Sequence, residues 1–201
     1  IKITQDASST DNLQGYAFIK AGTFNTNGWY MFYHDGAGDY QKFQFYTNQD
    51  GANRPLTSDS NIVHGTWYHL AITYDVSETT GTIYINGEKD NDSDSQTAPV
   101  SFTGDIEMGA SDVNEIGAIM SEIVYWKGVV LSASQVAGLY NNGRPRHGLS
   151  CERSYIKSWW KLNADDDTGS NNVLDSSGNS RHGTTAAGMA SGDFDTTDVP
   201  S

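Results

Sequence analysis

Glu115 and Glu122 are the carboxylate residues in this sequence that we consider for hydrolytic chemistry, which needs a pair of such groups. A retaining glycosidase needs two carboxyl groups about 5 Å apart. A strand holds such a pair on one face at even spacing, as in Glu-x-Asp-x-Glu. The sequence has no such pattern, and Glu115 and Glu122 are seven residues apart, which places them on opposite faces of a regular strand. We therefore expect no catalytic site, and we expect that the chain is not an enzyme.

Metal ligands are scarce in the sequence. The five histidines show neither His-x-His nor His-Glu-x-x-His spacing, and Cys151 is the one cysteine, so neither a zinc site nor an internal disulfide is expected. Asp165 and Asp167 stand in an acidic loop that resembles the start of an EF-hand. However, a glycine falls at its fifth position and no Glu at its twelfth. We expect a solvated loop and no cofactor, with calcium at Asp165 and Asp167 as the alternative.

Aromatic and acidic residues occur together in two neighbouring segments. Trp29 lies in NTNGWY, and Asp35, Asp39 and Tyr40 lie in HDGAGDY. Ligand sites join aromatic and apolar surface to a few polar groups, and a sugar site needs this combination. These four residues are therefore candidate ligand-binding residues. The alternative is coincidence, because such combinations are frequent in an aromatic-rich chain.

The net charge of the chain limits the classes of partner that it is expected to bind. Asp and Glu number 25 against 12 Lys and Arg, which gives a net charge of −13. Nucleic-acid binders need basic side chains against the phosphates, so no nucleic acid is expected. The acidity also disfavours docking on an anionic membrane, and no apolar run is long enough for membrane insertion. Since the chain opens with Ile-Lys-Ile and no initiator Met, we expect a fragment or a processed product.

The elements that would position these residues are predicted to be strands. Aromatic-rich runs alternate with Gly, Asn and Asp turn signals. The candidate strands are residues 15–21, 28–34, 42–48, 65–75, 81–89, 105–110 and 115–126. Apolar residues fall on both faces of 65–75, which predicts an interior strand. The residues expected in the core between two sheets are Tyr68, Leu70, Ile72, Ile83 and Ile85.

Two local signals interrupt the strands. Residues 131–143 predict one short helix, because Ser132 and Gln135 have the spacing of a capping box and Gly143 stands just past the expected end. In the segment DSSGN, Asp175 is expected to accept backbone N–H bonds as an Asx-turn.

Four motifs in order carry a resemblance to a known family. They are GTWYHLAITYD, GTIYINGEKD, EIVYWKGVVLSASQVAGLYNNG and SWWKLN…DSSGNSRHGT. With these motifs the chain resembles a laminin-G-like domain of the concanavalin A-like lectin/glucanase superfamily. The resemblance implies an all-β jelly-roll sandwich of two antiparallel sheets with one short helix.

One motif departs from the family's order. The WWKL element ordinarily opens such a domain, whereas here it stands near the end. We expect residues 1–148 to form a jelly roll that lacks its usual first strands, and the WWKL strand of residues 149–201 to close it. The alternatives are that this segment opens the next repeat or is donated to a neighbouring chain. Strand alternation then places Trp160 in the core and Trp159 outside among lysines, as a contact residue and a fifth candidate ligand-binding residue.

The resemblance also implies a function. It suggests a non-catalytic structural or adhesion module of a larger extracellular or virion assembly, because similar arrays occur in structural proteins of tailed bacteriophages. A carbohydrate-binding, lectin-like module is the first alternative, and a glycan hydrolase is the second. The partners implied are other protein chains of the assembly and surface glycans. The expected location is extracellular or on a virion surface.

Overall fold

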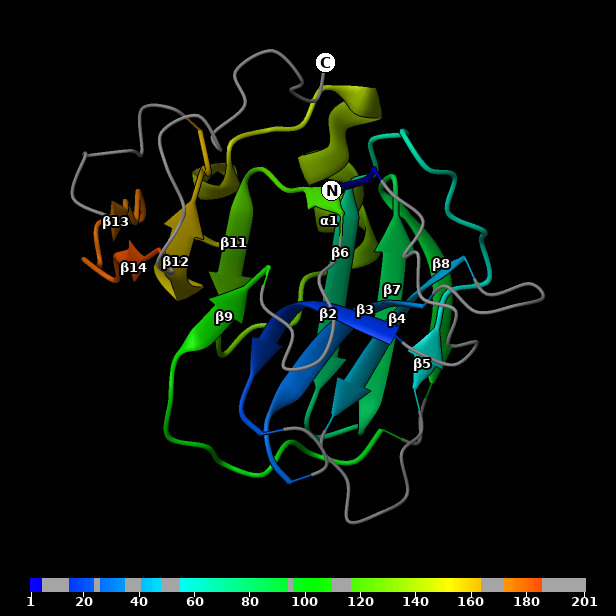
Figure 1. Cartoon of the computed structure of the whole chain (residues 1–201), viewed down its shortest axis with the longest axis horizontal. Helices are drawn as coiled ribbons and strands as arrows, with labels where there is room; N and C mark the ends of the chain where they lie inside the picture. The colour runs from blue at the N-terminus through cyan, green and yellow to red at the C-terminus, as the bar shows by residue number, and fades with distance from the viewer. Residues whose placement is uncertain are drawn as a thin grey trace. The chain divides into compact units, whose positions relative to one another are not determined.

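The chain folds into two compact units, Ile1–Ile119 and Met120–Ser201, in a computed structural model. The structure describes residues 1–4, 15–23, 26–34, 41–47, 55–93, 96–109, 117–163 and 172–185. Most of the described elements are short antiparallel strands, joined at turns rich in Gly and Asn (Figure 1). Among the described helices, none is long and apolar enough to cross a membrane.

The first unit contains two antiparallel sheets. The five-stranded sheet has the order β5-β4-β3-β2-β9, and the three-stranded sheet has the order β6-β7-β8. The strands of the first are β2 (Gly15–Ala21), β3 (Trp29–His34), β4 (Lys42–Thr47), β5 (Leu56–Thr57) and β9 (Ile106–Met108). Those of the second are β6 (Leu70–Asp75), β7 (Thr80–Ile85) and β8 (Glu88–Ser93). A further pair joins β1 (Lys2–Ile3) to β10 (Ala118–Ile119).

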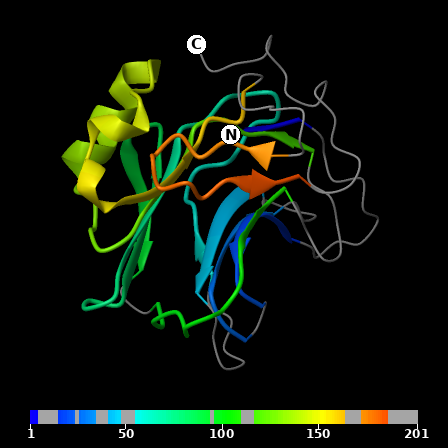
Figure 2. The same cartoon turned by 90° about the vertical axis from the view of Figure 1, so that its left-hand side faces the viewer.

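The two sheets of the first unit lie face to face, as Figure 2 shows for the blue-to-cyan and green strands. Aromatic rings connect them: Phe43 of β4 meets Tyr68 at 6.1 Å between ring centroids, and Phe45 meets Tyr74 at 6.3 Å. Phe43 is fully buried, as is Ile83 on the facing sheet. This sandwich, with one short α-helix elsewhere in the described chain, confirms the predicted concanavalin A-like jelly-roll class.

The residues predicted for the core of β6 and β7 divide into two groups. Ile83 and Ile85 of β7 are buried, whereas Tyr68, Leu70 and Ile72 are half-buried. In the sheet order, β7 is the central strand and β6 is an end strand, so the prediction of an interior strand at 65–75 is wrong. Apolar residues on both faces therefore did not distinguish the central strand from its neighbour.

The second unit is built on the antiparallel pair β11 (Ile123–Trp126) and β12 (Ile156–Trp160). Along the chain, these two strands are separated by α1 (Ala133–Tyr140) and the short 3₁₀ helices η1 (Asn141–Gly143), η2 (Gly148–Ser150) and η3 (Arg153–Tyr155). The pair β13 (Asn172–Val173) and β14 (Gly183–Thr184) follows. The pairing register of β11 with β12 shifts between Tyr125 and Trp126, so β12 has one extra residue at that point of the ladder.

Helix α1 begins and ends largely as its sequence predicts. Ser132 Oγ accepts the backbone N–H of Gln135 at 3.3 Å, and the Gln135 side chain accepts the N–H of Ser132 at 2.8 Å. This is the predicted capping box. The first left-handed residue past the helix is Asn141, with φ 49°, two positions before the predicted Gly143. Asn tolerates that conformation better than most residues, so the chain turns early.

Candidate carbohydrate-binding face

The five-stranded sheet has one face that points away from the three-stranded sheet. Because Phe43 and Phe45 of β4 point inward, Gln44 and Tyr46 alternate to the opposite face. The strand register then places side chains of β2, β3, β5 and β9 beside them. We call this surface the outer face; its residues are Lys20, Tyr30, Phe32, His34, Lys42, Gln44, Tyr46, Thr57 and Glu107.

Aromatic rings form the middle of the outer face. The Phe32 ring meets Tyr46 edge-on, with ring centroids 5.0 Å apart, and lies 6.1 Å from Tyr30. Tyr30 is buried, and its hydroxyl donates to the backbone oxygen of Asn27 at 2.9 Å. Phe32 and Tyr46 are half-buried, so they lie over this fixed layer with part of each residue exposed.

Polar groups flank the rings and bond to one another. Tyr46 donates its hydroxyl to Gln44 Oε1 at 2.9 Å, and Gln44 Nε2 donates to Thr57 Oγ1 at 3.2 Å. Burial raises the pKa of Tyr46 to about 12, so its hydroxyl keeps its proton at neutral pH. On the other side of the rings, Lys20 Nζ lies 3.3 Å from Glu107 Oε2. These bonds hold the polar groups in place before any ligand arrives.

This arrangement can bind a flat, hydroxyl-rich ligand. A sugar presents an apolar C–H face that can lie on Phe32 and Tyr46, and hydroxyl groups that can reach the half-buried Thr57 hydroxyl beside them. Gln44 is buried, and its amide holds the Tyr46 hydroxyl in place. Hydrolysis would need a second carboxylate near the first. Among the described residues of the outer face, Glu107 is the one carboxylate, and it is paired with Lys20.

The predicted ligand residues lie elsewhere or outside the described residues. Trp29 is half-buried and begins β3, in register with Ala21 and Thr47, so alternation places it on the inward side of the sheet. Asp35, Asp39 and Tyr40 lie outside the described residues, and so do the calcium candidates Asp165 and Asp167. The structure therefore does not bring the predicted set together, and their ligand roles stay predictions.

Sequence reasoning missed Phe32, Gln44 and Tyr46. A signal was present in the run KFQFYT, where Gln44 and Tyr46 alternate with Phe43 and Phe45. Finding the partner ring required the pairing of β3 with β4, because Phe32 stands in register with Gln44. A single sequence does not specify that register.

The prediction that Trp159 lies outside as a contact residue is wrong, because its exposed fraction is 2%. Its ring lies 3.9 Å from the His147 ring between centroids, and Lys161 Nζ lies 5.1 Å from it. The indole N–H donates to Glu122 Oε2 at 2.6 Å. His147, just before η2, thus covers the face of β12 that strand alternation predicted to be exposed to solvent. Trp160 is buried as predicted, with an exposed fraction of 6%.

The DSSGN segment forms a polar cluster against β12. Asp175 accepts the backbone N–H groups of Trp159, Ser177 and Arg181, each at 2.9 Å. Burial alone would raise the pKa of Asp175, but hydrogen bonds from Ser177 and these backbone groups hold it below its ordinary value. The predicted Asx-turn is confirmed, and it is larger than expected because it also fastens the strand at Trp159.

Other groups singled out by their chemistry have structural roles. Glu122 sits at φ 56° between β10 and β11 and accepts from the Trp159 indole, whereas Glu115 lies outside the described residues. Burial lowers the pKa of His69 to about 4, so His69 is neutral at pH 7. No group of three or more His, Cys, Asp or Glu side chains in the described part of the chain could hold a metal ion.

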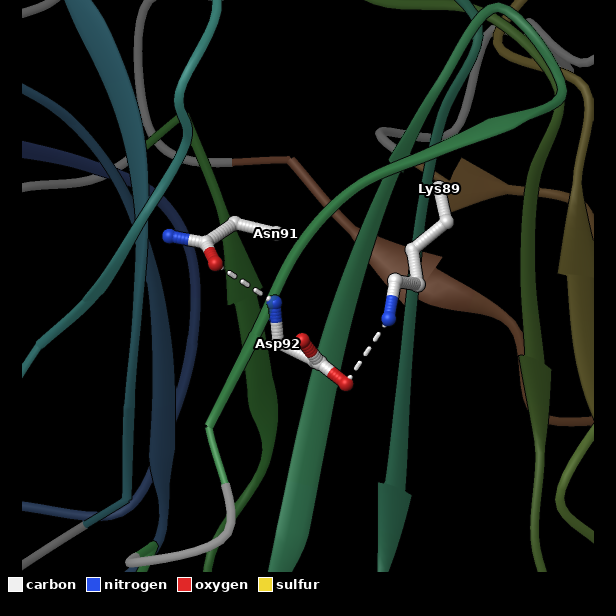
Figure 3. Close-up of polar contacts among 3 residues, drawn as sticks. All are labelled: Lys89, Asn91 and Asp92. Atoms are coloured by element: carbon white, nitrogen blue, oxygen red, sulfur yellow. Dashed lines mark hydrogen bonds and ion pairs between the residues drawn. The ribbon is translucent and has the colours of Figure 1, made fainter.

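Asn91 begins an Asn-x-Ser sequence on β8, but its amide is already engaged. Its Nδ2 donates to the Thr57 backbone oxygen at 2.8 Å, and its Oδ1 accepts the Asp92 N–H at 2.8 Å. Figure 3 shows the contact between Asn91 and Asp92 and the ion pair between Asp92 and Lys89, 2.9 Å long. The Asn91 amide thus links the three-stranded sheet to β5 of the facing sheet.

The two facing antiparallel sheets define a β-sandwich of the concanavalin A-like class. A laminin-G family, described as the concanavalin A-like lectin/glucanases superfamily, matches residues 6–137, and the chain belongs to it. No protein with a curated description matches the chain.

Two solved structures are similar to the chain. One is a proposed carbohydrate-binding protein from Bacteroides ovatus, with 20% identity and a TM-score of 0.61 over 94% of this chain and 53% of that one. The chain thus spans about half the length of that protein. The other is an S-layer domain-containing protein from Clostridium thermocellum, with 22% identity and a TM-score of 0.31 over 66% of this chain and 65% of that one. At these identities the first likeness supports the fold alone.

Proposed function

We propose that the chain is a non-catalytic, carbohydrate-binding module of a larger extracellular assembly, and that the outer face contacts the glycan. The observation that carries the proposal is the half-buried pair Phe32 and Tyr46 beside the fixed amide of Gln44. The name of the Bacteroides ovatus protein, which shares the fold, is in keeping with it. Absence of catalysis is part of the proposal, since Glu107 has no neighbouring carboxylate among the described residues of this face.

A glycan array tests this function. We expect the chain to bind a subset of glycans, and Phe32→Ala to abolish that binding without unfolding the protein. Tyr155→Ala is the matched control, because it removes a ring that is 40% exposed in the second unit. Loss of binding in the control, or no binding by the unaltered chain to any glycan, would contradict a role for the outer face.

A structural role in a virion is the second candidate. It is supported by the order of the motifs in the sequence, with the WWKL element at the end, which resembles repeats in phage structural proteins. The module would then sit on a particle surface and contact other chains of the assembly. Mass spectrometry of purified particles from the source would detect the chain if this setting is right. Particles that lack it would remove the virion setting and leave glycan binding untouched.

We propose that the module needs no cofactor. Calcium at Asp165 and Asp167 is the alternative, and it has a simple test. The thermal unfolding midpoint is expected to be the same in excess calcium and in excess chelator, because ligand binding to the folded state would raise it. A rise in calcium that Asp165→Asn removes would establish the site.

A further inference from the structure

The second unit carries a basic region in an otherwise acidic chain. Residues 120–163 contain six Lys and Arg against two Asp and Glu, a net charge of +4. Residues 1–119 contain five against sixteen, a net charge of −11. The remaining residues 164–201 contain one against seven, which completes the −13 of the whole chain. The charges of the chain are thus segregated along its length.

Three basic side chains of this region lie near Tyr155. We call Lys127, Arg153 and Lys157 the basic surface. Lys127 and Arg153 are exposed, and Lys157 is half-buried. Within the described residues none of them contacts a carboxylate, whereas the ion pairs Lys20–Glu107 and Lys89–Asp92 both lie in the first unit. Unpaired cations in an acidic protein are available to an acidic partner.

An exposed aromatic residue lies among these cations. Lys127 donates its backbone N–H to the oxygen of Tyr155 at 3.0 Å, which brings it beside Arg153 and Lys157. Tyr155 is 40% exposed, and its ring lies over Gly128, where an added β-carbon would stand 3.5 Å from it. Tyr and Arg are enriched at the centres of protein interfaces. The combination is that of a protein-binding surface.

We propose that the basic surface binds the acidic first unit of a second copy of the chain, in a head-to-tail contact. Every copy carries both signs of charge, so each junction would bring opposite charges together. Outside these two ion pairs, exposed carboxylates lie on the described first unit at Asp59, Glu78, Glu88 and Asp105. A free polyanion, by contrast, would meet one favourable region and two repulsive ones. A contact of two different surfaces builds rings or open chains of copies.

The inference extends the assembly role proposed above and does not depend on glycan binding, so the two can fail separately. The test is sedimentation velocity of the full chain at two ionic strengths. At about 0.01 M salt the Debye length is about 30 Å, and at about 1 M it is about 3 Å. We expect oligomers in the first condition and monomers in the second. Monomers in both conditions, or oligomers that persist at high salt, would overturn the proposal.

Two variants with the same change of charge locate the contact. Arg153→Glu is expected to weaken association by about ten-fold or more, because it reverses a charge of the basic surface in the same 3₁₀ helix as Tyr155. Lys89→Glu makes the same change on the first unit and is expected not to weaken it. Equal loss in both variants would mean that net charge, and not this surface, governs association.

A mixing experiment tests the head-to-tail geometry. A copy with Lys127→Glu and Arg153→Glu keeps its acidic first unit, so it should cap unaltered copies and shorten their oligomers. Oligomers of unchanged size in the mixture would contradict the geometry. If the unaltered chain stays monomeric but binds dextran sulfate through Arg153, the partner of the surface is a polyanion and self-assembly is wrong.

Discussion

Two regions of the molecule contain similar residues but use them in different ways. One is the outer face of the first unit, and the other is the group formed by Trp159, Trp160 and Asp175 in the second unit, which we call the β12 cluster. Both combine aromatic rings with polar side chains. On the outer face, Gln44 and Tyr46 bond to side chains of the same surface, and the rings of Phe32 and Tyr46 stay half-buried. In the β12 cluster, Asp175 bonds to backbone N–H groups and both tryptophans are buried. The identity of the hydrogen-bond partners thus separates the proposed binding surface from a structural core.

The same difference governs the energetic cost of changing each region. Removing a buried ring leaves a cavity, and removing the acceptor of several buried N–H groups leaves them unsatisfied. A half-buried ring on a sheet face contributes less to stability and remains available to a ligand. We therefore expect stability effects to concentrate in the β12 cluster and binding effects on the outer face.

The largest effect is expected from deletion of everything after Ser150. The truncated chain loses β12 and leaves the edge of β11 without its partner. Exposed strand edges template association between chains, so we expect aggregation, measured by light scattering of the purified protein. If the truncated chain is a stable monomer, residues 149–201 do not close the jelly roll, and the segment belongs to another repeat or to a neighbouring chain.

The next largest effect is expected from Trp159→Ala, which tests the buried position of this ring against the exposed position that strand alternation predicted. Because the ring is buried between His147 and Lys161, we expect a loss of about 3–5 kcal/mol in unfolding free energy, the same as for Trp160→Ala. Denaturant unfolding followed by circular dichroism measures both. A Trp159→Ala variant as stable as the unaltered chain would restore the surface role predicted from the sequence.

Local features of both regions could be predicted because a few adjacent residues determine them. The capping box at Ser132 and Gln135 follows from spacing alone, and so does the Asx-turn at Asp175. The fold class followed from strand patterns and from motifs in order. The position of Trp159 could not be predicted, because the residues that cover it come from a separate loop around His147. Likewise, the outer face depends on the register of β3 with β4, which no local pattern encodes.

Asp175→Asn tests the polar half of the β12 cluster. The amide keeps one acceptor oxygen where the carboxylate has two, so at least one of three backbone N–H groups loses its partner. We expect a loss of about 1–3 kcal/mol at pH 7. The folded-state pKa of Asp175 is below its ordinary value of 3.8, so its contribution is present above that pH. It is lost as the pH falls through the folded-state pKa.

The pH dependence separates the charge of Asp175 from its shape. Urea unfolding at pH 7 and at pH 3 should show a larger difference for the unaltered chain than for Asp175→Asn, because the variant has no proton to gain at this position. An identical difference in both proteins would mean that the carboxylate is not stabilised by its backbone donors. Ser101→Ala, at an exposed position of the first unit, serves as a control for general effects of substitution.

The smallest change in stability is expected from Tyr46→Phe on the outer face. The substitution keeps the ring next to Phe32 and removes the hydroxyl that donates to Gln44. One lost hydrogen bond at a half-buried site costs about 0.5–1.5 kcal/mol, so the fold should survive. If the Tyr46 ring must be held in place to receive a sugar, glycan binding should still weaken several-fold, because the freed ring then has to be ordered on binding.

Titration calorimetry with a glycan identified on the array measures this loss of affinity. Trp159→Ala in the same assay should change stability without changing the affinity of the folded fraction. The opposite result, unchanged glycan affinity in Tyr46→Phe and Phe32→Ala but reduced affinity in Trp159→Ala, would move the site from the outer face to the β12 cluster.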